Sequence, residues 1–191
     1  MKPHDVSIFA TTTTAGRGQN MFKELLAIDP KLLTAFTGVF SRYEYALKSS
    51  GFANGGINKV DPDWDAFAQS VADKFDDLNE TGFREAVIYL VTNPPRKQVL
   101  NAHGLGWKDS PPDSKLRASA QALLMVRRVR NNLFHGGKFW MPESPIRDRN
   151  EKLVKASLAV LLACLPLNPR VCMTFGPLPR DNEKRLSRLA A

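Results

Sequence analysis

The sequence predicts an all-α fold, an antiparallel four-helix bundle with an insertion between the second and third long helices. Apolar residues recur at steps of three and four over several long stretches, which is the spacing of one face of a helix. Alternating apolar and polar runs flanked by hairpin turns, which would indicate strands, are almost absent. Glycine and proline pairs separate the periodic stretches, so each stretch is expected to form one helix.

The first helix is expected to begin where Asp29 caps it and Pro30 occupies its first turn. Gly51 and the Asn54-Gly55-Gly56 segment are expected to end it. A second helix is expected from about Asp61-Pro62. The apolar face of the first helix consists of Leu32, Leu33, Phe36, Val39, Phe40, Tyr43, Ala46 and Leu47, and that of the second consists of Trp64, Phe67, Val71 and Phe75.

The insertion is expected over about residues 80–112. Its first part, Glu85 to Val91, suits a short helix that Pro94-Pro95 stops, and the remainder is interpreted as a structured loop. The third long helix is expected to open at Asp113 or Ser114 and to end at Gly136-Gly137. The fourth is expected from about Asp148 to Cys164.

The chain is therefore divided into three parts: a flexible N-terminal lead-in over residues 1–20, a helical domain over 21–179, and a basic C-terminal tail over 180–191. The lead-in shows little periodicity and contains the threonines Thr11 to Thr14. The tail is expected to form a short, frayed helix. With 191 residues, the chain is long enough for one good core.

The charge balance favours a polyanionic partner. Lys and Arg number 27 against 19 Asp and Glu, a net charge of +8, and nucleic acid is the simplest polyanion to match it. The two cysteines, Cys164 and Cys172, are too few for a disulfide scaffold, and no Cys or His pairs stand at zinc-ligand spacing. No apolar run approaches the roughly 18 residues of a membrane span. We expect a reduced, cytoplasmic protein without membrane, metal or cofactor.

The residues that carry chemistry lie at the end of the third helix. Asn131 and His135 are one turn apart on one face, whereas Arg130 lies roughly 140° from His135 around an ideal axis. Histidine exchanges protons near neutral pH, arginine binds phosphate, and asparagine orients either partner. This set suits metal-independent RNA cleavage, in which the substrate's own 2′-hydroxyl attacks the phosphate. Further cations for RNA binding are Arg127, Arg128 and Lys138.

Two structural alternatives apply to the same residues. Basic residues at a helix end also complement the helix dipole, at about 0.3–1 kcal/mol each. Glu44, one turn before Lys48, suits an ordinary surface pair, or it lies in the bundle groove and holds either Arg130 or the Arg127-Arg128 pair.

The segment from Arg130 to His135 resembles the Arg-x(4–6)-His signature of HEPN-domain proteins, in the form with a polar residue after the arginine. The stretch from Phe40 to Lys48 is similar to the first helix of that family, and the resemblance covers about Pro30 to Leu165. Gly137 stands where members controlled by tyrosine adenylylation carry a tyrosine, so that control is not implied.

The resemblance implies a homodimeric ribonuclease of toxin or antiviral-defence type, with a composite site and possible control by an antitoxin or regulatory protein. It implies that Arg130 binds phosphate, that Asn131 is a positioning residue, and that His135 acts as acid or base. The family also contains non-catalytic members, so a silent module that binds RNA or a protein partner is the alternative. A third reading is a helical adaptor whose basic surface docks a polyanion.

Overall fold

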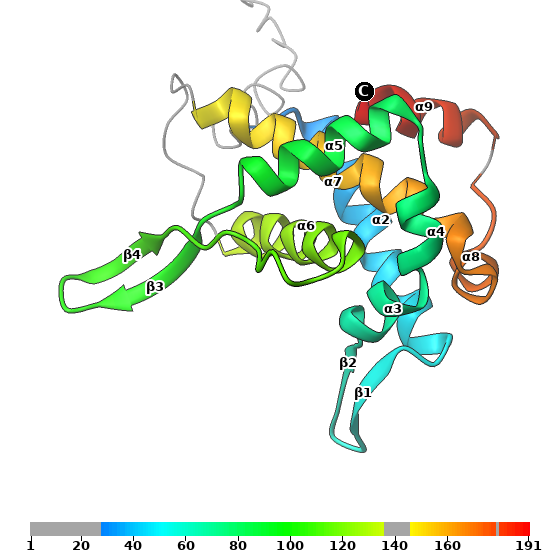
Figure 1. The fold of residues 1–191 in the computed structure, drawn as a ribbon, viewed down its shortest axis with the longest axis horizontal. Helices are drawn as coiled ribbons and strands as arrows, with labels where there is room; N and C mark the ends of the chain where they lie inside the picture. Colours follow the sequence, from blue (N-terminus) through cyan, green and yellow to red (C-terminus); the bar gives the residue numbers. More distant parts are fainter. Residues whose placement is uncertain (1–27, 136–145, 179) are drawn as a thin grey trace, which may run out of the picture.

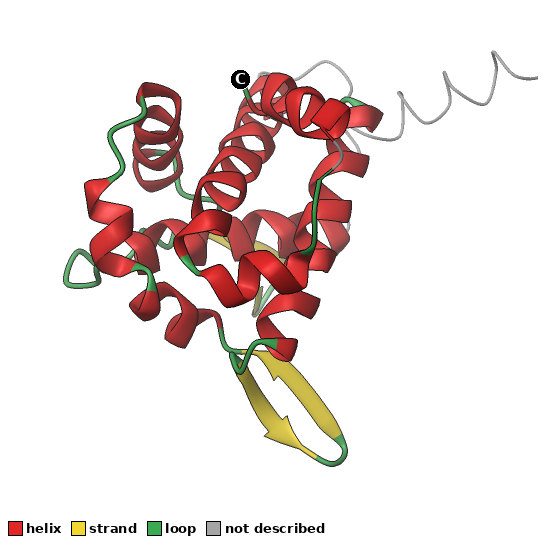
Figure 2. Ribbon diagram, turned by 90° about the vertical axis from the view of Figure 1, so that its right-hand side faces the viewer, coloured by secondary structure: helices red, strands yellow, loops and turns green. Residues whose placement is uncertain are grey.

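The computed structural model describes residues 28–135, 146–178 and 180–191. Within these ranges the chain forms eight α-helices and two small antiparallel sheets of two strands each (Figure 1). The helices pack together, and Figure 2 shows one of the two hairpins, formed by residues 53–62, extending clear of them. The predominantly helical class is therefore confirmed. The expected lead-in over residues 1–20 lies outside the described residues.

Helix α2 (Pro30–Ser49) begins as the sequence predicts. The Asp29 carboxylate accepts hydrogen bonds from the backbone N–H groups of Lys31, at 2.7 Å, and Leu32, at 3.3 Å. These bonds satisfy two donors that the first helical turn would otherwise leave free. The buried face matches the predicted apolar face apart from Leu33, which is half-buried: Leu32, Phe36, Val39, Phe40, Tyr43, Ala46 and Leu47.

A hairpin that the sequence did not predict follows, formed by β1 (Ala53–Gly56) and β2 (Lys59–Pro62). Its residues are almost all exposed, so the strands carry no apolar alternation that would reveal them. Gly55 adopts a φ of +131°, and a Cβ there would lie 2.1 Å from the carbonyl oxygen of Lys59. The segment expected only to end a helix therefore needs glycine at this position inside β1, where the backbone of β2 approaches closely.

The second predicted helix is two short helices, α3 (Trp64–Ser70) and α4 (Ala72–Asp77). The chain bends at Val71, whose side chain is fully buried. Asp63 caps α3 by accepting a hydrogen bond from Ala66 N at 2.9 Å. The apolar spacing indicated the buried residues correctly, and it did not indicate the bend.

Residues 80–112 contain α5 (Thr81–Thr92) and a second hairpin of β3 (Lys97–Asn101) and β4 (Gly104–Lys108). The short helix expected at Glu85 to Val91 is thus present and longer. It buries Phe83, Ala86 and Leu90 and packs along α7, so it belongs to the core. The hairpin instead projects away from the helices (Figure 1).

The remaining helices are α6 (Ala118–Phe134), α7 (Ile146–Cys164), α8 (Pro169–Phe175) and α9 (Arg180–Ala190), with the 3-10 turn η1 (Leu165–Leu167) after α7. Helix α6 begins later than expected because Asp113 caps a separate turn, in which it accepts from Lys115 N at 2.9 Å. The helix expected in the basic tail is α9.

The core surrounds α7, which packs against α2, α5, α6 and α9. Trp64 lies in this core, as expected, and stacks on Tyr43 with ring centroids 5.6 Å apart. Both cysteines are free thiols, and Cys164 is fully buried. The largest completely buried side chains are Tyr43, Phe36, Phe67, Phe75 and Phe175.

Candidate functional site

The candidate site lies at the C-terminal end of α6, where the predicted motif is found. The helix ends at Phe134, and His135 follows as its C-cap, with its backbone N–H donating to the Asn131 carbonyl at 3.0 Å. Val126 and Val129 anchor the helix end in the core and are fully buried. The neighbouring polar residues are therefore held at the surface by a rigid support.

The Arg130 guanidinium contacts four side chains. Its guanidinium carbon lies 5.3 Å from the ring centroid of Phe40 on α2 and 5.1 Å from that of Phe134. Its Nη2 lies 3.5 Å from the Glu44 carboxylate, and its Nη1 donates to the Asn131 side-chain oxygen at 3.0 Å. The structure thus places Glu44 against Arg130, the groove interpretation of that residue.

This environment orients the guanidinium without burying it. The Arg130 side chain keeps 33% of its exposure and Glu44 keeps 23%. A guanidinium carries five N–H donors, and the two contacts use one on each terminal nitrogen. Three donors remain for a ligand. Arg130 can therefore bind a phosphate oxygen while the aromatic rings and Glu44 hold its plane.

His135 is exposed, and no hydrogen bond or ion pair joins its imidazole to Arg130 or to any other described residue. The predicted angular separation along the helix accounts for this, because the two side chains leave α6 in different directions. The described part of one copy therefore presents an oriented cation and an exposed imidazole at the same helix end, with no hydrogen bond or ion pair between them.

Arg127 and Arg128 bond to residues outside this site. Arg127 pairs with Asp65 of α3 at 3.1 Å. Arg128 donates to the Ser110 carbonyl, and burial, followed by the nearby charge of Arg127, lowers the pKa of its guanidinium. Both were predicted as RNA contacts, and both are used in holding neighbouring segments. Lys138 lies outside the described residues.

Two residues near the site were not predicted as part of it. Phe134 follows Arg130 by four positions, so the helical spacing could have indicated their contact. Asn132 is buried, and its side-chain amide donates to the Arg96 carbonyl at 2.8 Å, which ties the helix end to the base of the β3–β4 hairpin. Nothing in the local sequence indicates that bond, because its partners are 36 residues apart.

Among the described residues, no group of three or more His, Cys, Asp or Glu side chains is arranged to hold a metal ion. His103 lies in the exposed turn between β3 and β4, where its backbone N–H donates to the Asn101 side chain. In the same ranges no single helix is long and apolar enough to cross a membrane. Residues Asp148–Leu167 and Pro169–Phe175 pass that test together by length and composition alone, across a bend of 115°.

The predicted residues thus separate into three groups. Arg130, Asn131 and Glu44 are brought together through their side chains. His135 follows Asn131 by one turn and bonds it through the backbone alone, and Arg127 and Arg128 serve other contacts. Comparisons of the chain with protein-family models, with curated proteins and with solved structures found no match.

Proposed function

We propose that this protein is a metal-independent endoribonuclease of HEPN-like fold, whose site at the end of α6 is completed by a second copy of the chain. The observation that carries the proposal is the oriented guanidinium of Arg130, held by Phe40, Phe134 and Glu44 on the same exposed helix end as His135. Preorganised cations of this kind stabilise charge that develops at phosphorus in the transition state.

The four helices of the proposed bundle are α2, α5, α6 and α7. Helix α7 packs against each of the other three, and α5 also packs against α6. This arrangement supports a bundle whose second helix is α5, in place of the helix expected from Asp61-Pro62. The inserted element is then the β3–β4 hairpin alone and not the whole of residues 80–112. The Arg130 and Glu44 side chains then come from two different bundle helices, α6 and α2.

The proposed reaction uses the RNA 2′-hydroxyl as nucleophile. Its proton passes to the imidazole of His135 acting as base, the 2′-oxygen forms a bond to phosphorus, and the bond from phosphorus to the 5′-oxygen breaks. A second protonated imidazole gives its proton to the leaving 5′-oxygen. The products are a 2′,3′-cyclic phosphate and a 5′-hydroxyl. Arg130 holds the non-bridging oxygens, and Asn131 positions Arg130.

The need for a base and an acid supports a homodimer. The described residues of one copy offer one histidine at the site, and a two-fold axis near His135 would bring a second. Phe134 beside it is 58% exposed, an apolar surface at the place where the second copy is proposed to meet the first.

The test is RNA cleavage by purified protein in EDTA, comparing wild type with Arg130→Ala and His135→Ala. Both variants should lose cleavage by at least about a hundredfold. His103→Ala is the matched control, because it removes another exposed histidine. Cleavage that survives in His135→Ala, or that requires a divalent ion, would overturn the proposal. So would sedimentation as a monomer at concentrations where the enzyme is active.

We further propose a cytoplasmic defence effector or toxin, whose activity an antitoxin or regulatory protein restrains. Toxicity on expression that Arg130→Ala relieves would support this role. Growth unaffected by wild-type protein that cleaves RNA in vitro would count against it.

A catalytically silent RNA-binding module is the second candidate. The pairing of Arg130 with Glu44 favours it, because the carboxylate offsets part of the charge that catalysis would use. In that case RNA binds, Arg130→Ala weakens binding, and no variant or condition produces cleavage.

A further inference from the structure

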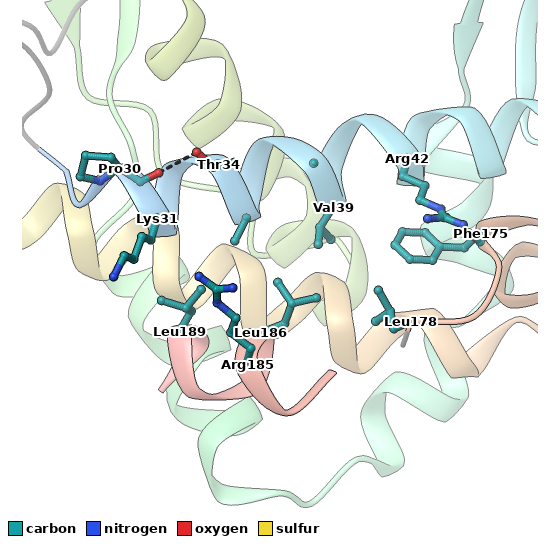
Figure 3. A pocket seen from close by; sticks show the side chains of 12 residues that line it. Pro30, Lys31, Thr34, Val39, Arg42, Phe175, Leu178, Arg185, Leu186 and Leu189 are labelled. Carbon is teal, nitrogen blue, oxygen red and sulfur yellow. Dashed lines mark hydrogen bonds between the residues drawn. The ribbon is translucent and has the colours of Figure 1, made fainter. Parts of the chain in front are cut away.

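A cavity of about 610 Å³ lies between α2 and the C-terminal segment, remote in sequence from the α6 residues (Figure 3). Residues of α2 form one wall, and Leu178, Leu186 and Leu189 from the end of the chain form the other. Its volume falls within the range of roughly 300–1,000 Å³ that is usual for small-molecule sites.

The wall on α2 follows one face of the helix. Lys31, Ala35, Gly38 and Arg42 recur at steps of three and four, so they lie on one face of the helix, and all four line the cavity. Small residues occupy the middle of this face, and cations occupy its two ends. Lys31 and Arg42 are eleven positions apart on the helix, which corresponds to about 16 Å along its axis. The cavity is therefore elongated along the α2 axis.

Gly38 has no packing role toward the described residues. It lies inside a helix, where glycine is less stable than alanine by about 0.5–1 kcal/mol. A Cβ added there would meet no atom of the described residues within 4 Å, and the backbone does not require glycine's special φ values. The loss of helix stability at Gly38 is explained if a ligand lies against the backbone where a side chain would otherwise stand.

The charges around the cavity are one-sided. Lys31, Arg42 and Arg185 line it, and no described lining residue is an Asp or a Glu. Lys31 and Arg185 form no ion pair with another described residue. Arg42 is already engaged, because its Nε donates to the Phe175 carbonyl and its guanidinium lies 5.2 Å from that ring's centroid. The cations without an ion-pair partner among the described residues, Lys31 and Arg185, are thus at the Lys31 end of the cavity.

We propose that this cavity binds a linear amphipathic anion of the fatty-carboxylate class. The carboxylate lies at Lys31 and Arg185, and the chain runs past Gly38 between Val39 and Leu186 toward Phe175. The elongated aliphatic wall favours a straight chain over a compact ring system. Lys31 and Arg185, which have no ion-pair partner among the described residues, favour a charged head group over an alcohol. This site is separate from the proposed ribonuclease site, so each can fail without the other.

The test is calorimetric titration of the full-length protein with sodium laurate, below the concentration at which it forms micelles. Dodecanol serves as the uncharged chain and inorganic phosphate as the anion without a chain. Laurate should bind with one molecule per chain and on the order of tenfold more tightly than dodecanol, and phosphate alone should give no saturable binding. Equal binding of laurate and dodecanol, or saturable binding of phosphate, would overturn the proposal.

Two variants locate the binding. Gly38→Leu places a side chain in the cavity and should abolish laurate binding while the thermal midpoint stays level or rises, since the change removes a helical glycine. Gly82→Leu is its control, because Gly82 also lies in a helix with free space at its Cβ and does not line the cavity.

Arg185→Glu should weaken laurate by at least about tenfold, whereas Lys184→Glu, with the same charge change one residue away, should not. Should Gly38→Leu lose its circular dichroism spectrum, the Arg185 and Lys184 pair still decides the question. Laurate affinity that Arg185→Glu leaves unchanged would overturn the proposal.

Discussion

Replacing Glu44 by glutamine tests whether the orientation of Arg130 matters for the proposed reaction. The substitution keeps the size of the side chain and its hydrogen-bonding oxygen and removes only the negative charge 3.5 Å from Arg130 Nη2. We expect kcat for RNA cleavage to fall by about tenfold, which corresponds to about 1.4 kcal/mol of transition-state stabilisation. KM should stay level or fall, because a carboxylate beside the phosphate site repels the substrate.

The effect on stability should be much smaller than the bare attraction suggests. Two unit charges at 3.5 Å attract by about 1 kcal/mol in bulk water and by about 5 kcal/mol at an effective dielectric constant of about 20. Both side chains remain partly exposed, at 33% and 23%, so solvent screening reduces the net value to about 0–1 kcal/mol. The thermal midpoint should therefore fall by no more than about 4 °C.

The assay measures kcat and KM with a fluorogenic RNA in EDTA, alongside thermal unfolding of each variant. Glu80→Gln is the matched control, because Glu80 is exposed and its side chain makes no capping bond at the start of α5. An unchanged kcat in Glu44→Gln would refute the idea that Glu44 positions the arginine. A large loss of stability with a proportional loss of activity would show that the pair supports the fold instead.

Three further predictions concern the core and the hairpin base. Tyr43→Phe should stabilise the protein by about 1–2 kcal/mol in urea unfolding, because the buried Tyr43 hydroxyl has no hydrogen-bond partner among the described residues; destabilisation would indicate a partner. Burial raises the pKa of the Cys164 thiol, so the unfolded chain releases this proton first as pH rises. The contribution of this raised pKa to the free energy of unfolding is complete below the unfolded pKa of about 8.5 and is lost above it by up to about 1.4 kcal/mol per pH unit. Cys164→Ala should therefore reduce the slope of the unfolding free energy against pH between pH 9 and 10.5. An identical slope in the variant would contradict this. Asn132→Ala removes the bond to the Arg96 carbonyl and should cost about 1–3 kcal/mol and speed hydrogen exchange in β3; unchanged exchange would mean that this bond does not hold the hairpin.

The long helices could be predicted from the sequence because their information is local. Asp29 and Pro30 mark the start of α2, and its apolar residues at steps of three and four are the residues that are buried. The same periodicity located the bodies of α6 and α7 and the short helix within residues 80–112. The apolar spacing and the helix cap depend on the residues of one helix, so they can be recognised without knowing which helices pack against it.

The hairpins and the bend at Val71 could not be predicted in this way. The strands of β1 and β2 are exposed on both faces, so burial imposes no alternation on their sequence. Val71 continues the apolar spacing of the helix before it, although the chain turns there to bury it. The periodic pattern records which residues are buried, and it does not record where the backbone changes direction.

The candidate site divides in the same manner. The residues Arg130, Asn131 and His135, and their place at a helix end, follow from the sequence alone. Only the tertiary structure decides that Phe40 and Glu44 of another helix hold Arg130, and that Arg127 and Arg128 turn away to Asp65 and Ser110. The physical reason is that a helix fixes the direction in which each side chain leaves it, whereas the partner in that direction comes from whichever segment packs there.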